Sequence, residues 1–297
     1  DLADHQSEWV EPVSQSFRGH EVHEIPPNGQ GMAALMALGI LEQLPYEETP
    51  AGSAQRAHLE IEAMRLAFAD LHAHVGDPAH MRFSAADLLD KAYLKERARS
   101  IDPKKAGRHQ AGAPKSSGTV YLCAADSEGR MVSFIQSNYR GFGSGVVVPG
   151  TGISLHNRGS GFVTTEGHPN QVAPGKRPLH SIIPAFLTRQ GKPVMAFGVM
   201  GGNMQAQGHT QLVLRKVVDQ LNPQACSDAP RWRIDDSSAL IVEPEMPAEV
   251  VEELAAMGHT PRVMPKQNLD FGSAQLVERL DNGVEGPSAY VAGSDHR

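Results

Sequence analysis

A threonine opens a strongly β-forming segment directly after a stretch rich in glycine, proline and serine. Thr119 begins the run 119–125 and follows Gly118. A hydroxyl is a poor nucleophile unless a base lies beside it, and cleavage of the Gly118-Thr119 bond would supply one in the α-amine of Thr119 itself. The alternative is an ordinary threonine at the first position of a strand. The junction by itself leaves both interpretations open.

Two glycine-rich segments could contribute backbone N–H donors to the same chemistry. Gly141-Phe-Gly-Ser-Gly145 follows a predicted hairpin, and Gly198-Val-Met-Gly-Gly202 lies where a strand should pass into a helix. A Gly-Gly pair there lets amide groups point into a cleft at a helix N-terminus, as an oxyanion site requires. The alternative is tight turn geometry that favours glycine. The first segment lacks the strand-to-helix context of a dinucleotide fingerprint.

The elements that must position these groups are strands and helices in about equal weight. Apolar periodicity predicts helices at 32–44, 55–74, 85–100, 205–221 and 248–257. Strands are predicted at 16–25, 119–125, 131–137, 146–148, 152–156, 182–188, 193–199, 272–280 and 286–292. Several connections are hairpins, and strict strand-helix alternation is missing. The pattern therefore predicts an α+β or layered sandwich fold rather than a doubly wound sheet.

One polar segment divides the chain. Residues 102–118 hold two prolines, three glycines and two serines between predicted elements. Such composition is typical of an exposed, flexible connection. We therefore place a boundary here, between a region 1–118 that ends in this linker and a region 119–297.

Composition excludes several classes of protein. The 297 residues include 27 Lys+Arg and 34 Asp+Glu, giving a formal net charge of 27 − 34 = −7. No basic stripe is present that could displace phosphate counterions, so we expect no nucleic-acid partner. The longest apolar run, 31–41, is too short to span a bilayer, so we expect no membrane partner. With only Cys123 and Cys226, the chain can build neither a disulfide framework nor a cysteine zinc site.

The histidines do not form a metal-binding pattern. There are 14 of them, which invites the question. His72 and His74 are two residues apart on a predicted helix and face different ways, and His20 and His23 occupy opposite faces of a predicted strand. We predict no metal site from this spacing.

Five longer motifs occur together in one order along the chain. They are Pro26-Pro-Asn-Gly-Gln-Gly31, Phe142-Gly-Ser-Gly-Val-Val-Val-Pro-Gly150, Gly175-Lys-Arg-Pro-Leu179, Gly201-Gly202 and Asp228-Ala-Pro-Arg231. With these motifs the chain resembles the gamma-glutamyltransferase (gamma-glutamyltranspeptidase) family of N-terminal-nucleophile hydrolases over essentially its whole length. The resemblance implies a four-layer αββα sandwich, incomplete because the N-terminal half of the precursor is missing. Residues 1–118 would be the end of the large subunit, and 119–297 the small subunit.

The resemblance also implies residue roles. The precursor would cut itself between Gly118 and Thr119, and Thr119 would then form an acyl-enzyme from a γ-glutamyl amide such as glutathione. Ser137 stands where the family places a hydroxyl that hydrogen-bonds the nucleophile, and Gly201 and Gly202 match the oxyanion-hole glycines. The acyl group would pass to water or to an amino acceptor.

The expected substrate-binding positions depart from the family pattern. Gly161 stands where an aspartate that holds the substrate α-amino group is expected, and Arg158 brings a positive charge nearby. Of a pair of serines only Ser181 remains, after His180, and Tyr139 replaces an asparagine. These residues, with Asn157, are the candidate substrate-binding set. A carboxylate-binding Arg158 would fit an anionic acyl group without the amine.

Three functional alternatives follow. The first is γ-glutamyl transfer or hydrolysis, the second is hydrolysis of a different amide by the same mechanism, and the third is a catalytically silent fragment or binding module. The resemblance implies no cofactor. Its implied partners are a small-molecule amide with water or an amino acceptor, the missing half of the precursor, and a second copy in a homodimer of processed heterodimers. No signal peptide is visible in this sequence, which leaves cytoplasm and periplasm open.

Overall fold

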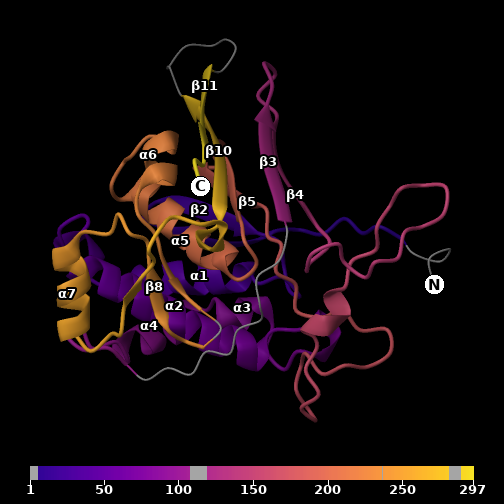
Figure 1. Cartoon of the computed structure of the whole chain (residues 1–297), viewed down its shortest axis with the longest axis horizontal. Helices are drawn as coiled ribbons and strands as arrows, with labels where there is room; N and C mark the ends of the chain where they lie inside the picture. The colour runs from indigo at the N-terminus through magenta and orange to yellow at the C-terminus, as the bar shows by residue number, and fades with distance from the viewer. Residues whose placement is uncertain (1–5, 108–118, 236, 281–288) are drawn as a thin grey trace.

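A six-stranded antiparallel sheet forms the centre of the protein (Figure 1). The computed structural model describes residues 6–107, 119–235, 237–280 and 289–297. The sheet has the spatial order β1 (Val13–Phe17), β2 (His20–Glu24), β5 (Ala185–Arg189), β6 (Lys192–Met200), β10 (Ser273–Leu280) and β11 (Ala289–Ser294). Each neighbouring pair is antiparallel.

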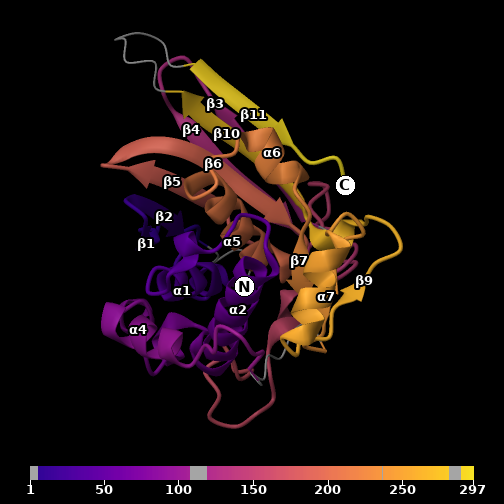
Figure 2. The same ribbon diagram turned by 90° about the vertical axis from the view of Figure 1, so that its left-hand side faces the viewer.

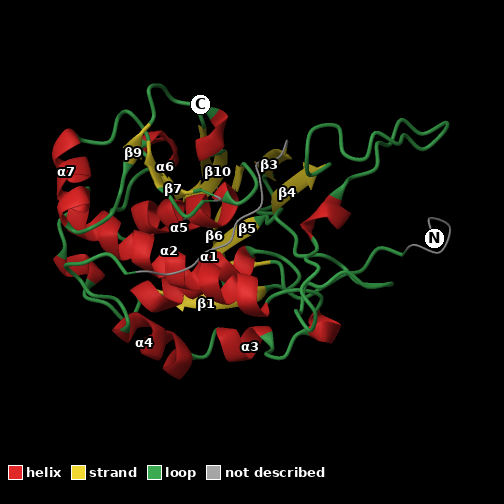
Figure 3. Ribbon diagram, turned by 60° about the horizontal axis from the view of Figure 1, so that its bottom comes forward, coloured by secondary structure: helices red, strands yellow, loops and turns green. Residues whose placement is uncertain are grey.

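Helices cover one face of this sheet (Figure 2). Every residue of α1 (Gly31–Leu41) is buried, because the sheet lies on one side of this apolar helix and α2 (Ala54–His74) on the other. Helix α5 (Met204–Val217) packs beside α1 and against β6. The remaining helices are α3 (Ala85–Leu88), α4 (Lys91–Arg99), α6 (Pro223–Asp228) and α7 (Ala248–Ala256). The core of the protein therefore lies between the sheet and these helices (Figure 3).

A two-stranded hairpin covers the other face of the sheet. It consists of β3 (Thr119–Ala125) and β4 (Met131–Ser137), and it packs on β6 and β10. The ring of Tyr121 points inward to β6, where Gly198 makes room for it, since a Cβ at position 198 would lie 2.4 Å from the ring. On the outer face Val120, Leu122 and Phe134 are exposed. The described residues thus form three layers, helix, sheet and sheet, of an αββα sandwich.

Shorter elements complete the fold. A small sheet contains β7 (Trp232–Ile234), β8 (Leu240–Val242) and β9 (Arg262–Val263). Single 3-10 turns occur as η2 (Tyr46–Glu48), η3 (Pro78–His80), η4 (Arg158–Gly161) and η5 (Leu269–Phe271). The segment between β4 and β5 is largely irregular and runs out to one side of the molecule in Figure 1. Across the described residues we find no helix with both the length and the apolar character needed to cross a membrane.

The expected α+β sandwich is confirmed, and several predicted boundaries are corrected. The hairpin 119–125 and 131–137 is confirmed to the residue. The predicted helix 85–100 is two helices, because the side chain of Asp90 caps α4 by accepting two backbone N–H bonds. The predicted strand 16–25 is a hairpin that turns at Arg18 and Gly19, both with positive φ.

Other predicted strands are wrong or were missed. Segments 146–148 and 152–156 form only one isolated bridge, between Val147 and Ser154, because the chain turns at Gly150 and Gly152. Strands β7, β8 and β9 went unpredicted, since runs of two or three residues carry too little periodicity. The predicted linker begins with residues tied to the body, as the N–H of Gly107 donates to Glu62 at 2.8 Å. Residues 108–118, including Gly118, lie outside the described residues.

Candidate active site

The two ends of the β3–β4 hairpin bring two hydroxyl groups together. Thr119 and Ser137 are direct partners in the antiparallel register, so their side chains share one face. Thr119 Oγ1 donates a hydrogen bond to Ser137 Oγ at 3.1 Å. Thr119 is only 8% exposed, on the inner face of the hairpin that contacts the large sheet. The geometry therefore pairs the predicted nucleophile with the predicted hydroxyl partner.

Tyr139 fixes the orientation of this pair. Its backbone N–H donates to Ser137 Oγ at 2.9 Å. The residue adopts a φ of +76°, a left-handed conformation that few non-glycine residues take, and its side chain is buried. The strained turn brings the N–H back onto Ser137. This backbone contact was not foreseen from the sequence, which singled out Tyr139 only for its side chain.

The Gly201-Gly202 pair lies between β6 and α5, as the motif predicts. Gly201 has a φ of +124° and Gly202 a φ of +61°, both disfavoured for other residues. Ser133 Oγ donates a hydrogen bond to the carbonyl oxygen of Phe197 at 3.4 Å. Tyr121, which lies two residues nearer the open end of the hairpin, packs over Gly198, the next residue of β6. Thr119 must therefore lie toward the end of β6 at which the Gly-Gly turn begins.

Two buried side chains, those of Gln30 and His209, hold this turn and its helix in place. Gln30 Nε2 donates to the carbonyl of Gly202 at 2.8 Å and also to the carbonyl of Ser181, which joins the turn to a second site segment. His209 of α5 donates from Nδ1 to Glu24 at 2.7 Å and accepts from the N–H of Val199 at Nε2. Burial raises the pKa of Glu24. Sequence analysis missed Gln30, although it lies within the motif 26–31.

Arg158 is a buried guanidinium beside this site. It is 3% exposed at the start of η4, and its Nη1 donates to Ser181 Oγ at 3.0 Å. Its guanidinium carbon lies 5.1 Å from the ring centroid of Tyr139, within cation-π range. Nη2 is buried, and no residue in the described part of the chain gives it a hydrogen bond. Burial lowers the pKa of Arg158 to about 10, so it stays charged at neutral pH.

The neighbouring candidates have separate places. His180 is largely buried, and burial followed by the charge of Arg158 lowers its pKa to about 3. Tyr139, Gly161, His180 and Ser181 line one small cavity, together with Gln30 and Asn203. Thr119 does not line it and is connected to it through Ser137 and Tyr139.

Asn157 has a structural rather than a substrate-facing set of contacts. Its Oδ1 accepts from the N–H of Arg140 at 3.0 Å, and its Nδ2 donates to the carbonyl of Gly143 at 3.0 Å. The side chain thus holds the glycine-rich loop after β4. Its predicted role in substrate binding stays a prediction.

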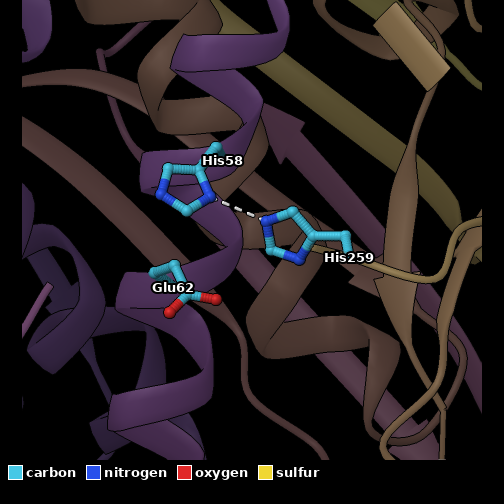
Figure 4. Close-up of side chains that lie close together, drawn as sticks. All are labelled: His58, Glu62 and His259. Atoms are coloured by element: carbon cyan, nitrogen blue, oxygen red, sulfur yellow. Dashed lines mark hydrogen bonds between the residues drawn. The ribbon is translucent and has the colours of Figure 1, made fainter. Parts of the chain in front are cut away.

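A second cluster of ligating side chains went unnoticed in the sequence. His58, Glu62 and His259 are buried and close together, the first two one turn apart on α2 (Figure 4). His58 Nε2 faces the carbonyl of Asp102 at 2.8 Å, so it carries the proton, and Nδ1 accepts from His259 Nε2 at 2.7 Å. Two zinc ligands in tetrahedral geometry would be about 3.3 Å apart. The contact therefore fits an N–H···N hydrogen bond that ties α2 to the segment after α7.

A helix layer, a six-stranded sheet and a hairpin stacked on that sheet form the N-terminal-nucleophile hydrolase type of fold. The family model described as Gamma-glutamyltranspeptidase matches residues 1–297. The chain belongs to this gamma-glutamyltranspeptidase family.

Relatives within the family carry several different names. The chain is similar to the "Glutathione hydrolase-like YwrD proenzyme" of Bacillus subtilis, with 34% identity over 95% of this chain and 54% of the relative. It is 33% identical to the "Oxamate amidohydrolase proenzyme" of Klebsiella pneumoniae, over 96% of this chain and 54% of that protein. The crystal structure of cephalosporin acylase from Bacillus halodurans matches with a TM-score of 0.90 and 44% identity, covering 99% of this chain and 53% of that one. The chain thus spans about half the length of these relatives.

Proposed function

We propose that this chain carries the catalytic half of an amidohydrolase that uses Thr119 as an N-terminal nucleophile. The observation that carries the proposal is the Thr119 Oγ1 to Ser137 Oγ contact of 3.1 Å at the open end of the hairpin. Maturation begins when Thr119 Oγ1 attacks the Gly118 carbonyl and displaces the Thr119 nitrogen. Water then hydrolyses the resulting ester and leaves Thr119 with a free α-amine.

In the mature site one residue supplies both nucleophile and base. The α-amine of Thr119 takes the proton from Oγ1 as Oγ1 attacks the substrate carbonyl carbon. The C–N bond breaks, the leaving amine receives that proton, and an ester on Oγ1 remains. Water, deprotonated by the same amine, then releases the acid. Ser137, held by the N–H of Tyr139, keeps Oγ1 in place.

The Gly201-Gly202 turn supplies the charge stabilisation for this reaction. The tetrahedral intermediate places a negative charge on the former carbonyl oxygen, and backbone N–H groups of the turn would donate to it. Such a donor is worth roughly 2.7–4 kcal/mol in other hydrolases. The positive φ values of both glycines support this role, because they orient the turn in a way that other residues resist.

The site favours an amide whose acyl group is not γ-glutamyl. A γ-glutamyl group carries an ammonium, which needs a negatively charged group nearby. Among the described residues the acyl side of the site offers buried, charged Arg158 and the uncharged Gly161 where a carboxylate was expected. The varied names of the relatives also speak for a shared mechanism with different acyl groups. Hydrolysis of a different amide is therefore favoured.

Self-cleavage tests the proposal directly. The intact mass is measured for this chain and for the longest reading frame that contains it, each beside Thr119→Ala, Thr119→Ser and Thr165→Ala. Thr165 is an exposed loop residue and serves as the matched control. We expect a fragment that begins at Thr119 in wild type and in Thr165→Ala, a slower cut in Thr119→Ser, and none in Thr119→Ala. An uncut wild type in both forms would leave the silent module as the better description.

A further inference from the structure

We propose that Arg158 binds a carboxylate of the substrate's acyl group, so that the substrates are amides of dicarboxylic acids that lack a neighbouring ammonium. The inference rests on the proposed function of Thr119. Recognition of a γ-glutamyl ammonium needs a negative charge on the acyl side of the site, whereas Arg158 places a positive charge there.

The first support is a buried charge without a counter-charge. Arg158 is 3% exposed, and among the described residues no carboxylate pairs with it. Its one side-chain hydrogen bond goes to the neutral hydroxyl of Ser181, and Nη2 is left without a partner. Removing a guanidinium from water costs free energy that pairing normally offsets. A ligand anion is the partner that this arrangement lacks.

The second support is that other buried arginines in the chain are paired. Arg56 pairs with Asp219, and Arg297 lies 3.0 Å from Asp295. Arg231 lies 2.7 Å from Asp295. Within the described residues Arg215 has no carboxylate in an ion pair either, but its guanidinium donates to the carbonyls of Cys226 and Pro230. Arg158 differs because its only acceptor among the described residues is one hydroxyl.

The third support is position. Arg158 stacks on Tyr139, the N–H of Tyr139 bonds Ser137, and Ser137 bonds Thr119. Tyr139 and Ser181 line the small cavity, and Arg158 contacts both of these residues. Arg158 does not itself line this cavity, and the Ser181 hydroxyl occupies its Nη1; a carboxylate that displaces this hydroxyl would meet Nη1 and Nη2 together, in the two parallel bonds that a guanidinium fork favours.

The described groups around Arg158 do not compensate its charge. His156 and His180 are neutral at pH 7, since burial first and Arg158 second lower the pKa of each. The guanidinium is thus the charge that a ligand meets, and it repels the ammonium of a γ-glutamyl group. The same charge that attracts a dicarboxylic half-acid excludes the family's namesake acyl group.

The test uses matched anilides on the matured full-length protein. The probes are the 4-nitroanilides of the half-acids of oxalic, succinic and glutaric acid, their methyl esters, and γ-glutamyl-4-nitroanilide. The last differs from the glutaric probe by the α-amine alone. We expect one half-acid to exceed its ester and the γ-glutamyl probe in kcat/KM. Arg158→Gln should lower kcat/KM for that half-acid roughly 30- to 100-fold and leave the ester within about threefold.

The control variant is Arg140→Gln. Arg140 also lies 5.1 Å from the ring centroid of Tyr139, but it is more exposed than Arg158. We expect kcat/KM for the preferred half-acid to change less than threefold in this variant. Equal Thr119-dependent rates for half-acid and ester, or a half-acid preference that survives Arg158→Gln, would overturn the inference while leaving the proposed function intact.

A binding measurement covers the case in which no probe is hydrolysed. The dianions oxalate, succinate and glutarate should raise the Tm of wild type but not of Arg158→Gln, whereas the neutral diamides should raise neither. Absence of any such shift would overturn the carboxylate site. Failure of the proposed function is separate, because it appears as no cut before Thr119 or as turnover that survives Thr119→Ala.

Discussion

Arg158 and Arg231 are two buried arginines in the same chain with opposite surroundings. Both are almost inaccessible, and burial lowers the pKa of each to about 10. Arg231 lies 2.7 Å from Asp295 and donates to the carbonyls of Phe271, Gly272 and Ser227. Arg158 donates to one hydroxyl. Among the described residues each arginine has one buried nitrogen without a partner, Nε in Arg231 and Nη2 in Arg158. The difference is the carboxylate, which Asp295 supplies to Arg231 and which no described residue supplies to Arg158.

The sequence motif around Arg231 now has a structural explanation. Arg231 connects the end of α6 to the segment before β10, and Gly272 accepts its bond at a φ of +75°. A Cβ at Gly272 would lie 2.4 Å from Val199, so the segment also packs tightly on β6. Arg231 thus supports the strand that leads to Gly201 without belonging to the site itself.

Loss of Arg231 should give the largest effect on stability. Arg231→Met leaves the Asp295 carboxylate buried with less compensation, and breaking such a pair costs about 3–5 kcal/mol. Arg158→Met removes an unpaired buried charge, so its free energy of unfolding should be unchanged or higher than that of wild type. Denaturant unfolding of both variants checks this. A loss of similar size in Arg158→Met would show that Arg158 has a structural role too.

The buried His259 should give a pH dependence of the free energy of unfolding, smaller than the loss expected for Arg231→Met. Burial, and then His58, lower the pKa of His259 to about 4 in the folded protein, against an ordinary value near 6.5. Between these values the unfolded chain binds a proton that the folded chain refuses. His259 should therefore contribute its full stabilisation above pH 6.5, and its share of the free energy of unfolding should fall by roughly 3 kcal/mol as the pH drops to 4.

Variants of two histidines isolate this contribution. His259→Gln should make the fall in stability between pH 6.5 and 4 shallower by the contribution of one histidine, since His72 and His180 also have lowered pKa values. The exposed His80→Gln should leave the wild-type slope. An unchanged slope in His259→Gln would contradict a lowered pKa of His259. Unlike the two arginines, His259 needs no counter-charge, because it is uncharged at neutral pH.

Gly161→Asp should produce the smallest effect and sharpen the comparison at the site itself. An ideal Cβ at Gly161 would lie 3.5 Å from the nearest atom, the carbonyl oxygen of Leu179, so a side chain can be accommodated. The new carboxylate would supply a counter-charge near Arg158. We expect kcat/KM for the preferred half-acid to fall about tenfold, on the order of 1.4 kcal/mol, and that for γ-glutamyl-4-nitroanilide to rise. Parallel losses for both probes would indicate disruption of the pocket instead.

Much of the architecture could be predicted from local pattern. The β3–β4 hairpin followed from two apolar runs around Asp126-Ser-Glu-Gly129, and α1 from an apolar run that Pro45 limits. The irregular segment between β4 and β5 could not be predicted, because its positive-φ glycines are compatible with strands or loops until tertiary contacts decide. The two-residue turn at Arg18 and Gly19 was missed for the same reason.

The candidate site residues followed from residue type, position and the resemblance, and not from contacts. The structure brings Thr119 within 3.1 Å of Ser137 and places Gly201-Gly202 between β6 and α5, while the catalytic roles of these residues stay a prediction. The backbone contribution of Tyr139 and the His58–His259 pair depend on segments that are distant in sequence or on an unusual φ. That no described carboxylate pairs with Arg158 is likewise a property of its surroundings, which one sequence does not reveal.

In the proposed mechanism Thr119 carries the acyl group. The matured full-length protein is mixed with the preferred half-acid anilide and quenched in acid, and its peptides are mapped by mass spectrometry. We predict the mass of the acyl group on the peptide that begins with Thr119, and no adduct in Thr119→Ala. An adduct on Ser137 or on any other residue, or turnover by Thr119→Ala at the wild-type rate, would contradict the mechanism.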